Sequence, residues 1–385
     1  MFEGADICPP SIFDETLCQQ LSNGQKTVEE FLQAIGGHIR LHQATLGADL
    51  GYIRSTLTQH FSDARHHVSN PAYKRQAVQF IYDEFQKHGL NTNYHNFTFR
   101  EVSYTNVIGV LKGERFGTYK DEIVGVGAHY DTVDITKGVD DNGSGVTAML
   151  ESLRQIAAGN QGDNRRKNTI IYMAFDHEEY GLTGSRLAID EWLLPWLTKN
   201  YGKDLELLKP NGIIVLDTVM NYNSSTQSQV IPPEAEQILY FPKTVKSIAS
   251  DQFKGDFLAT IFRQDLDGNL ASTFNSEWLG EPQPQFEIEM FEIAIDADVN
   301  LFGHFLRSDH ANFWKSPIPA IFITDSANFR GQMQQCYHNA CDNLANILTD
   351  NNVQFLGKTA DTIAATLDKL ADDTGTSGAS SVCFI

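Results

Sequence analysis

Apolar and polar residues alternate along the chain in a way that predicts strands interleaved with helices. Apolar runs predict strands at residues 97–102, 106–111, 123–127, 169–175, 213–216 and 320–324. Apolar residues spaced three and four apart predict helices at 71–88, at 144–159, where Ser144 would be the N-cap, and at 353–370. Strands that alternate with helices favour a largely parallel sheet covered by helices on both faces.

Three segments fall outside this pattern. We predict a polar, helical extension for residues 1–60, a main domain for residues 61–372, and a flexible tail rich in Gly, Ser and Thr for residues 373–385. Residues 221–303 contain scattered Pro, Gly and Gln and have no clear period. We therefore expect loops and short elements there, close to a substrate pocket.

Metal-type ligands stand at or just past the ends of several of the apolar runs. The side chains concerned are His129, Asp131, Asp141, Glu178, Glu179, Asp217 and His338. Open α/β sheets bind ligands beyond the carboxyl ends of their strands, so most of these groups should gather at one edge of the sheet. Zinc binds imidazole nitrogens and carboxylate oxygens, and a carboxylate can bridge two ions. The set predicts a hydrolytic site for two zinc ions, with two acids left for proton transfer.

Acidic residues outnumber basic ones in this chain. Lys and Arg number 29 and Asp and Glu 49, which gives a net charge of −20. This charge repels nucleic acid and anionic membranes, and no apolar run approaches the roughly 20 residues needed to cross a bilayer. We expect a soluble, globular monomer that has no nucleic-acid or membrane partner.

The five cysteines are too few for a disulfide scaffold, but two of them bracket a proposed ligand. Cys336 and Cys341 flank His338, and without a second Cys/His pair they favour a disulfide over a metal clip. A disulfide indicates an oxidising compartment. We therefore expect a secreted or periplasmic protein, although the first residues lack the basic and apolar parts of a signal peptide.

The five ligand-bearing segments, in this order, resemble those of a known family. They are Gly-Ala-His129-Tyr-Asp131, Val-Asp-Asp141-Asn-Gly-Ser-Gly, Phe-Asp-His-Glu178-Glu179-Tyr-Gly, Val-Leu-Asp217-Thr and Cys-Tyr337-His338-Asn-Ala-Cys-Asp. The family is the co-catalytic di-zinc aminopeptidases, typified by secreted bacterial leucyl aminopeptidases, and the resemblance covers roughly residues 62–370. It implies a three-layer α/β/α fold with a mixed, largely parallel central sheet flanked by helices.

The resemblance also implies how the metals are held. His129 and Asp217 would bind one zinc, Glu179 and His338 the other, and Asp141 would bridge the two ions. The peptide bond between Asp141 and Asn142 would be cis.

The remaining site residues receive roles in catalysis. Asp131 would accept the ring N–H of His129 that does not face the metal. By resemblance, Glu178 would act as general base on a metal-bridged water and Tyr337 would donate to the oxyanion. The implied reaction is zinc-dependent removal of N-terminal residues from peptides that have a free amine.

Other functions occur on related scaffolds. A glutaminyl cyclase-type transferase uses one zinc, a carboxypeptidase differs only in its pocket loops, and a receptor-type ectodomain has lost activity. The segment around His338 favours an aminopeptidase, and the complete ligand set argues against an ectodomain. Two further histidines are not assigned as ligands: we expect His310 to make structural hydrogen bonds and His177 to face the surface.

Overall fold

The computed structural model describes residues 47–159, 166–236, 240–294, 297–316 and 318–372. Most of the predicted N-terminal extension, the predicted C-terminal tail, and Cys8, Cys18 and Cys383 lie outside the described residues. Among the described residues, no helix combines the length and apolar character needed to cross a membrane.

Within the described residues, eight strands form one mixed sheet with the order β1-β2-β4-β3-β5-β8-β6-β7. Strands β3, β4, β5 and β8 run parallel to one another, β2 is antiparallel to both β1 and β4, and β6 is antiparallel to β8 and parallel to β7. The strands are β1 (Asn91–Phe99), β2 (Val102–Leu111), β3 (Val124–His129), β4 (Ile170–Phe175), β5 (Gly212–Leu216), β6 (Phe257–Arg263), β7 (Glu287–Ile293) and β8 (Ala320–Thr324).

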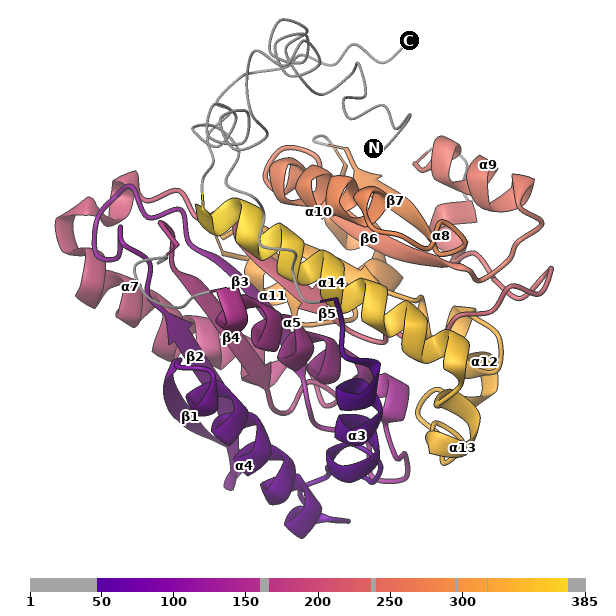
Figure 1. Ribbon diagram of the computed structural model, residues 1–385, viewed down its shortest axis with the longest axis horizontal. Helices are drawn as coiled ribbons and strands as arrows, with labels where there is room; N and C mark the ends of the chain where they lie inside the picture. Colours follow the sequence, from indigo (N-terminus) through magenta and orange to yellow (C-terminus); the bar gives the residue numbers. More distant parts are fainter. Residues whose placement is uncertain (1–46, 160–165, 237–239, 295–296, 317, 373–385) are drawn as a thin grey trace, which may run out of the picture. The chain divides into compact units, whose positions relative to one another are not determined.

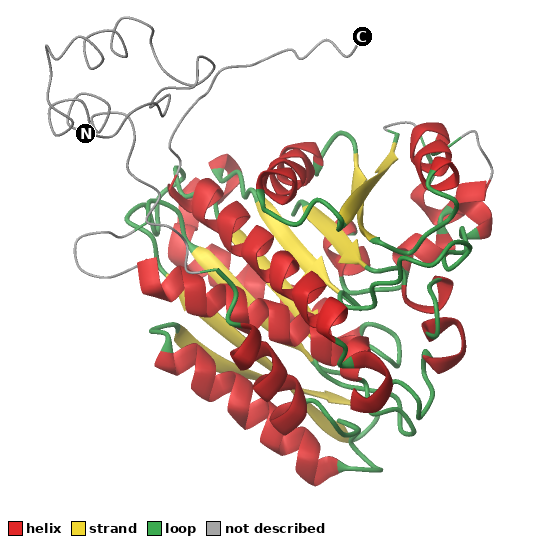
Figure 2. Ribbon diagram, turned by 45° about the vertical axis from the view of Figure 1, so that its right-hand side comes forward, coloured by secondary structure: helices red, strands yellow, loops and turns green. Residues whose placement is uncertain are grey.

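Helices cover both faces of this sheet, which gives the predicted three-layer α/β/α architecture (Figures 1 and 2). The α-helices are α3 (Leu50–His60), α4 (Pro71–Lys87), α5 (Gly145–Gly159), α6 (Thr183–Leu187), α7 (Leu194–Tyr201), α8 (Pro233–Glu236), α9 (Pro242–Ser250), α10 (Gly268–Gly280), α11 (His310–Trp314), α12 (Met333–Cys336), α13 (Leu344–Ile347) and α14 (Asp350–Asp372). Two π-helical turns span Val139–Ser144 and Ala188–Leu193, and short 3₁₀ turns span Gly202–Leu207, Val299–Leu301, Gly303–Leu306 and Ala327–Phe329.

Alternating side chains of the central strands fill two separate cores. In β4, Ile170, Tyr172 and Ala174 join the core beneath α3, α4, α5 and α14, whereas Ile171 and Met173 join the core beneath α7 and α11. Successive residues of a strand point to opposite faces, so a central strand must be apolar at every position. This is why the runs in β3, β4, β5 and β8 are continuous rather than alternating.

The predictions for the central strands and for the helices α4, α5 and α14 are confirmed, but the prediction that residues 221–303 form only loops and short elements is wrong. This stretch contains α9, β6, α10 and β7. In β7, Glu289 is buried whereas Ile288 and Met290 are only partly buried, so polarity does not follow burial along the strand. The sequence pattern of β7 is therefore misleading.

Two local predictions also need correction. Helix α5 is capped by Asn142 rather than by Ser144: the N–H of Gly145 donates to Asn142 Oδ1 at 3.0 Å, and Ser144 Oγ donates to the carbonyl of Asp140. Helix α3, predicted to belong to a separate extension, packs Ile53 and Leu57 into the same core as α5 and α14.

Candidate metal centre and active site

Three neighbouring strands bring the predicted ligands of β3, β4 and β5 to one edge of the sheet. His129 is the last residue of β3, Glu178 follows the end of β4 by three residues, and Asp217 directly follows β5. Because the sheet order is β4-β3-β5 and these strands are parallel, their carboxyl ends meet. The structure therefore brings these three side chains together, as the strand order predicts.

Asp141 reaches this edge from the turn that precedes α5. Asn142 fixes the turn to the end of β5, since its Nδ2 donates to the carbonyl of Leu216 at 2.8 Å and its Oδ1 accepts the N–H of Thr218. The Asp141–Asn142 peptide bond is cis, as the resemblance implies. From the other side, the carboxylate of Asp342 accepts the N–H groups of Asp140 and Asp141 at 2.8 and 3.0 Å.

His338 is presented by a short loop closed by the predicted disulfide. Cys336, at the end of α12, is bonded to Cys341. His338 has a left-handed backbone conformation, with φ of 58°, and the ring of Tyr337 stacks on its imidazole with the centroids 3.9 Å apart. The loop thus places both side chains against the Asp141 turn.

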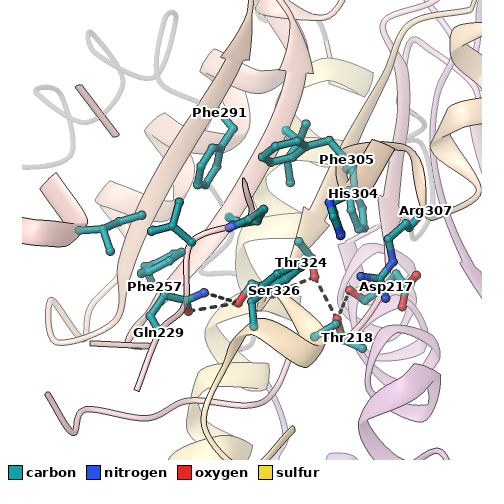
Figure 3. Close-up of a pocket in the computed structure, with 18 of the residues that line it drawn as sticks. Asp217, Thr218, Gln229, Phe257, Phe291, His304, Phe305, Arg307, Thr324 and Ser326 are labelled. Atoms are coloured by element: carbon teal, nitrogen blue, oxygen red, sulfur yellow. Dashed lines mark hydrogen bonds between the residues drawn. The ribbon is translucent and has the colours of Figure 1, made fainter. Parts of the chain in front are cut away.

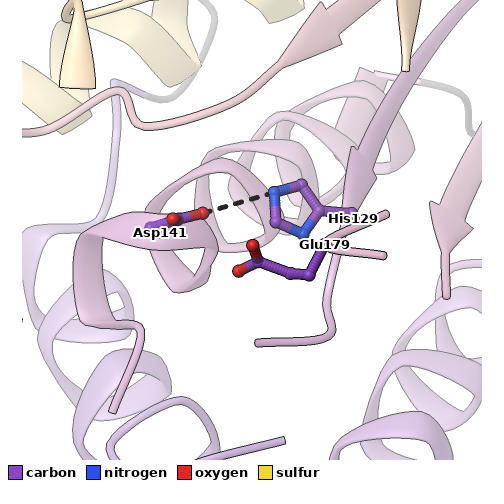
Figure 4. A group of neighbouring side chains, drawn as sticks. All are labelled: His129, Asp141 and Glu179. Atoms are coloured by element: carbon purple, nitrogen blue, oxygen red, sulfur yellow. Dashed lines mark ion pairs between the residues drawn. The ribbon is translucent and has the colours of Figure 1, made fainter. Parts of the chain in front are cut away.

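The spacing of the side chains suits zinc. His129 Nε2 lies 3.4 Å from Asp141 Oδ1 and 3.5 Å from Asp217 Oδ1, and His338 Nε2 lies 3.3 Å from Asp141 Oδ2 and 2.9 Å from Glu179 Oε2. Two ligands bound at about 2.0–2.1 Å to a tetrahedral ion are about 3.3–3.4 Å apart. Figure 4 shows His129, Asp141 and Glu179 converging on a common point. The two oxygens of Asp141 face different histidines, as a bridging carboxylate requires.

Unpaired buried atoms also point to a cation at this place. His129 Nε2 and Asp141 Oδ2 are buried and have no hydrogen-bond partner among the described residues. Burial raises the pKa of Glu178 well above its ordinary value and that of Glu179 to about 8. Burial alone would lower the pKa of His338, but the nearby carboxylates of Asp141 and Glu179 raise it to about 10. The donor set fits a divalent ion that would neutralise this excess of carboxylates.

The three residues predicted to act in catalysis adjoin the ligands. Asp131 Oδ1 lies 3.5 Å from His129 Nδ1 and accepts the N–H of Glu178 at 3.1 Å, so one carboxylate contacts both residues. Glu178 has a carboxylate oxygen in a cluster with His129 and Asp217. Tyr337 is mostly buried, and the guanidinium of Arg307 lies 5.0 Å from the centre of its ring.

An apolar pocket opens beside the ligands, between β6, β7 and β8 (Figure 3). Phe257 and Phe291 lie at one end, and Asp217 and Arg307 at the other. Its further apolar lining includes Ile248, Ala259, Ile261, Phe305 and Phe322. Asp217 belongs both to the pocket and to the cluster with His129 and Glu178, so the pocket adjoins the predicted metal ligands.

The expectations for the two unassigned histidines differ in outcome. His310 is fully buried, with its Nε2 2.7 Å from the carbonyl of Phe305 and its ring stacked on Phe322, which is the expected structural role. His177 does not face the surface: it is only 4% exposed and packs against Phe99 and Tyr104 of the β1–β2 hairpin. The hairpin buries His177, and the spacing of residues along the sequence does not predict this contact.

Two further buried groups support the site, and neither was assigned a role there from strand-end spacing. Arg65 is fully buried and donates to the carbonyls of Tyr130 and Gly138, which joins the segment after β3 to the start of the Asp141 turn. Asp309 is fully buried, and neither of its carboxylate oxygens has a hydrogen-bond partner among the described residues. Neither residue stands at a strand end, so strand-end spacing could not have found them.

Comparison with known proteins agrees with this geometry. Residues 106–265 match the model of peptidase family M28. A probable glutamate carboxypeptidase of Arthroderma benhamiae is 37% identical over 92 residues, which are 24% of this chain and 12% of that protein. Aminopeptidase YwaD of Bacillus subtilis is 36% identical over 92 residues, which are 24% of this chain and 19% of that protein. These sequence matches are local.

The fold extends further than the sequence match. The structure of an aminopeptidase from Aneurinibacillus superposes with a TM-score of 0.55 at 14% identity, covering 86% of this chain and 96% of that one. The predicted resemblance to the zinc aminopeptidases and the predicted zinc-exopeptidase-like fold are therefore confirmed.

Proposed function

We propose that this chain is a zinc-dependent aminopeptidase that removes N-terminal residues with large apolar side chains from peptides. The observation that carries the proposal is the position of Asp217, which lies at the junction of the apolar pocket and the ligand cluster. A substrate whose side chain fills the pocket brings its α-ammonium group to this junction. The carboxylates there, Asp217, Glu178 and Asp309, suit a positive charge.

We assign the metals to five residues and propose two ions per chain. His129 and Asp217 would hold one, Glu179 and His338 the other, and Asp141 both. Zinc at this centre would act as a Lewis acid that polarises the scissile carbonyl and lowers the pKa of water.

The chain's own groups would then move the protons and orient the partners. Glu178 takes a proton from water as general base and returns it to the leaving amine. Asp131 keeps Glu178 in place through the Glu178 N–H and faces His129 Nδ1. Tyr337 donates its hydroxyl hydrogen to the oxyanion.

A carboxypeptidase is the alternative that one observation favours. Arg307 lines the pocket beside Asp217 and could pair with a substrate carboxylate. However, Arg307 already donates to Asn328 Oδ1 at 2.8 Å and lies against the ring of Tyr337, so part of its donor capacity is used.

The test compares peptides that differ only at their ends. We expect the zinc-loaded enzyme to release Leu or Phe from free-amine peptides and from their C-terminally amidated forms, and to reject the N-acetylated forms. Cleavage of acetylated peptides with a free C-terminus would establish the carboxypeptidase instead. Ring closure of N-terminal Gln without release of any residue would establish the cyclase.

Glu178→Gln provides the matched inactive variant. We expect it to retain zinc and to lose roughly 10²- to 10⁴-fold in kcat, because general-base catalysis contributes about that much. Near-normal kcat in this variant at full zinc content would remove Glu178 from the mechanism.

A further inference from the structure

A second group of carboxylates lies beside the apolar pocket and shares no residue with the zinc ligands. Asp251 directly follows α9, Asp256 directly precedes β6, and Glu287 is the first residue of β7. Their carboxylate oxygens lie within 4.8 Å of one another. Because β6 is antiparallel to β8, its first residues lie at the same edge of the sheet as the carboxyl end of β8. The cluster and the zinc centre therefore occupy the same edge, several strands apart.

One buried carboxylate oxygen of this cluster has no hydrogen-bond partner among the described residues. Asp256 is 6% exposed, and its Oδ1 is buried without a hydrogen-bond partner among the described residues. Asp251 Oδ2 is likewise buried and has no hydrogen-bond partner among the described residues. The N–H of Glu287 is not available to Asp256 Oδ1, because it donates to the main-chain carbonyl of Asp256. A buried carboxylate oxygen that no donor contacts is costly unless a cation binds it.

Protein cations compensate only part of the negative charge. Lys254 Nζ contacts Asp251 Oδ1 at 2.5 Å, and within the described part of the chain no other ion pair reaches the cluster, although the buried Arg330 interacts with Asp256 at longer range. Burial, reinforced by Asp251 and Glu287, raises the pKa of Asp256 to about 6. Burial also raises the pKa of the adjacent Glu289, to about 7.

We propose that Asp251, Asp256 and Glu287 form a binding site for one calcium ion. Ca²⁺ takes six to eight oxygen ligands in flexible geometry, so three carboxylates and water can satisfy it. Mg²⁺ demands a near-ideal octahedron, and zinc prefers the imidazole and thiolate ligands that this cluster lacks. The site is thus chemically distinct from the zinc centre.

Calcium at this place would stabilise one wall of the pocket. Phe257, the residue after Asp256, lines the pocket. The loop from Asp251 to Asp256 also holds Gln229, another lining residue, because the N–H of Gln229 donates to the carbonyl of Phe253 at 2.9 Å. If the proposed aminopeptidase function holds, calcium should lower KM for peptides with large apolar N-terminal residues and leave kcat unchanged.

Calcium binding itself is measured without substrate, so this test does not depend on the proposed function. Zinc-loaded protein in metal-stripped buffer is titrated with CaCl₂ by calorimetry, and zinc content is measured before and after. We expect one Ca²⁺ per chain, with a Kd on the order of 10⁻⁴ to 10⁻³ M, a range found for extracellular calcium modules, and no loss of zinc. We also expect calcium to raise Tm, because it binds only the folded state.

Two variants and a matched control locate the ion. Asp256→Asn and the exposed Glu287→Gln should each weaken calcium binding by about tenfold or more, because each removes a charged ligand. Glu292→Gln removes the same charge from an exposed position on β7 outside the cluster and should bind calcium as the wild type does. Equal calcium affinity in wild type, Asp256→Asn and Glu287→Gln, or no calcium binding by the wild type at millimolar CaCl₂, would overturn the proposal.

Discussion

Asp342 offers a direct test of how the metal centre is held in place. Its two carboxylate oxygens accept the N–H groups of Asp140 and Asp141, and all three residues are buried. Asp342 also adjoins Cys341, so it joins the disulfide loop that carries His338 to the turn that carries Asp141. Substitution at this position should loosen the turn without removing any proposed ligand.

The expected magnitude follows from the two hydrogen bonds. Asp342→Ala leaves two buried N–H groups without an acceptor, at about 1–3 kcal/mol each. Asp342→Asn keeps one acceptor oxygen and places an amide group against the other N–H, so it should cost about half as much. Loss of such a supporting contact typically weakens metal binding by about 10- to 100-fold. We therefore expect zinc loss to be faster in both variants and fastest in Asp342→Ala.

The assay measures zinc transfer to a chelator and urea-induced unfolding of each zinc-loaded variant. Asp265→Asn, at an exposed position outside the site, is the matched control and should behave as the wild type. The reasoning is refuted if Asp342→Asn retains zinc and unfolds like this control. A loss of stability without any change in zinc affinity would also refute the proposed link to the metal turn.

Two further predictions concern the pocket and the pH dependence of stability. Ala259→Leu fills part of the pocket from β6 and should lower kcat/KM for Phe-peptides relative to Ala-peptides by at least about tenfold. The reason is that one methylene in an apolar pocket changes kcat/KM by about 10- to 200-fold. An equal loss of kcat/KM for both peptides would show that the pocket does not receive the substrate side chain. Burial raises the pKa of Asp361 from 3.8 to about 7, so its stabilising effect is present at low pH and is lost as the pH rises towards and through 7. Asp361→Asn, which can still accept from Gln155, should flatten this part of the urea-unfolding profile, and an unchanged slope between wild type and variant would contradict the assignment.

The sequence was informative wherever burial and polarity agree. The central strands are buried on both faces, so they are apolar at every position and can be recognised without knowledge of the fold. Their order along the chain then predicts that His129, Glu178 and Asp217 meet, because parallel strands end at a common edge. Asp141 and His338 lie on loops, so strand order alone does not bring them to this edge; residue type made them candidate ligands, and the resemblance to a known family gave each its predicted metal.

The sequence was uninformative where tertiary contacts decide the outcome. The charged residue Glu289 lies on the buried face of β7, and the opposite face carries half-buried apolar residues. Polar and apolar residues therefore do not alternate between an exposed and a buried face in this strand. His177 is covered by a hairpin that is distant in the sequence. Asp342 was visible in the sequence as the residue after Cys341, but its two bonds to the Asp141 turn depend on the path of the loop.

The distribution of buried acids indicates a second role for the proposed metal ions. The chain's net charge of −20 is compatible with a solvated acidic surface, yet several carboxylates lie fully buried at one edge of the sheet. Beside the proposed ligands these include Asp140, Asp309 and Asp325, and burial raises the pKa of all three. Arg65, which is buried nearby, uses its donors on backbone carbonyls rather than on these acids. The fully buried Arg330 offsets part of the charge of Asp325 and Asp140. Divalent cations would offset more of the charge at this edge, so the ions proposed for catalysis should also help to stabilise the fold around them.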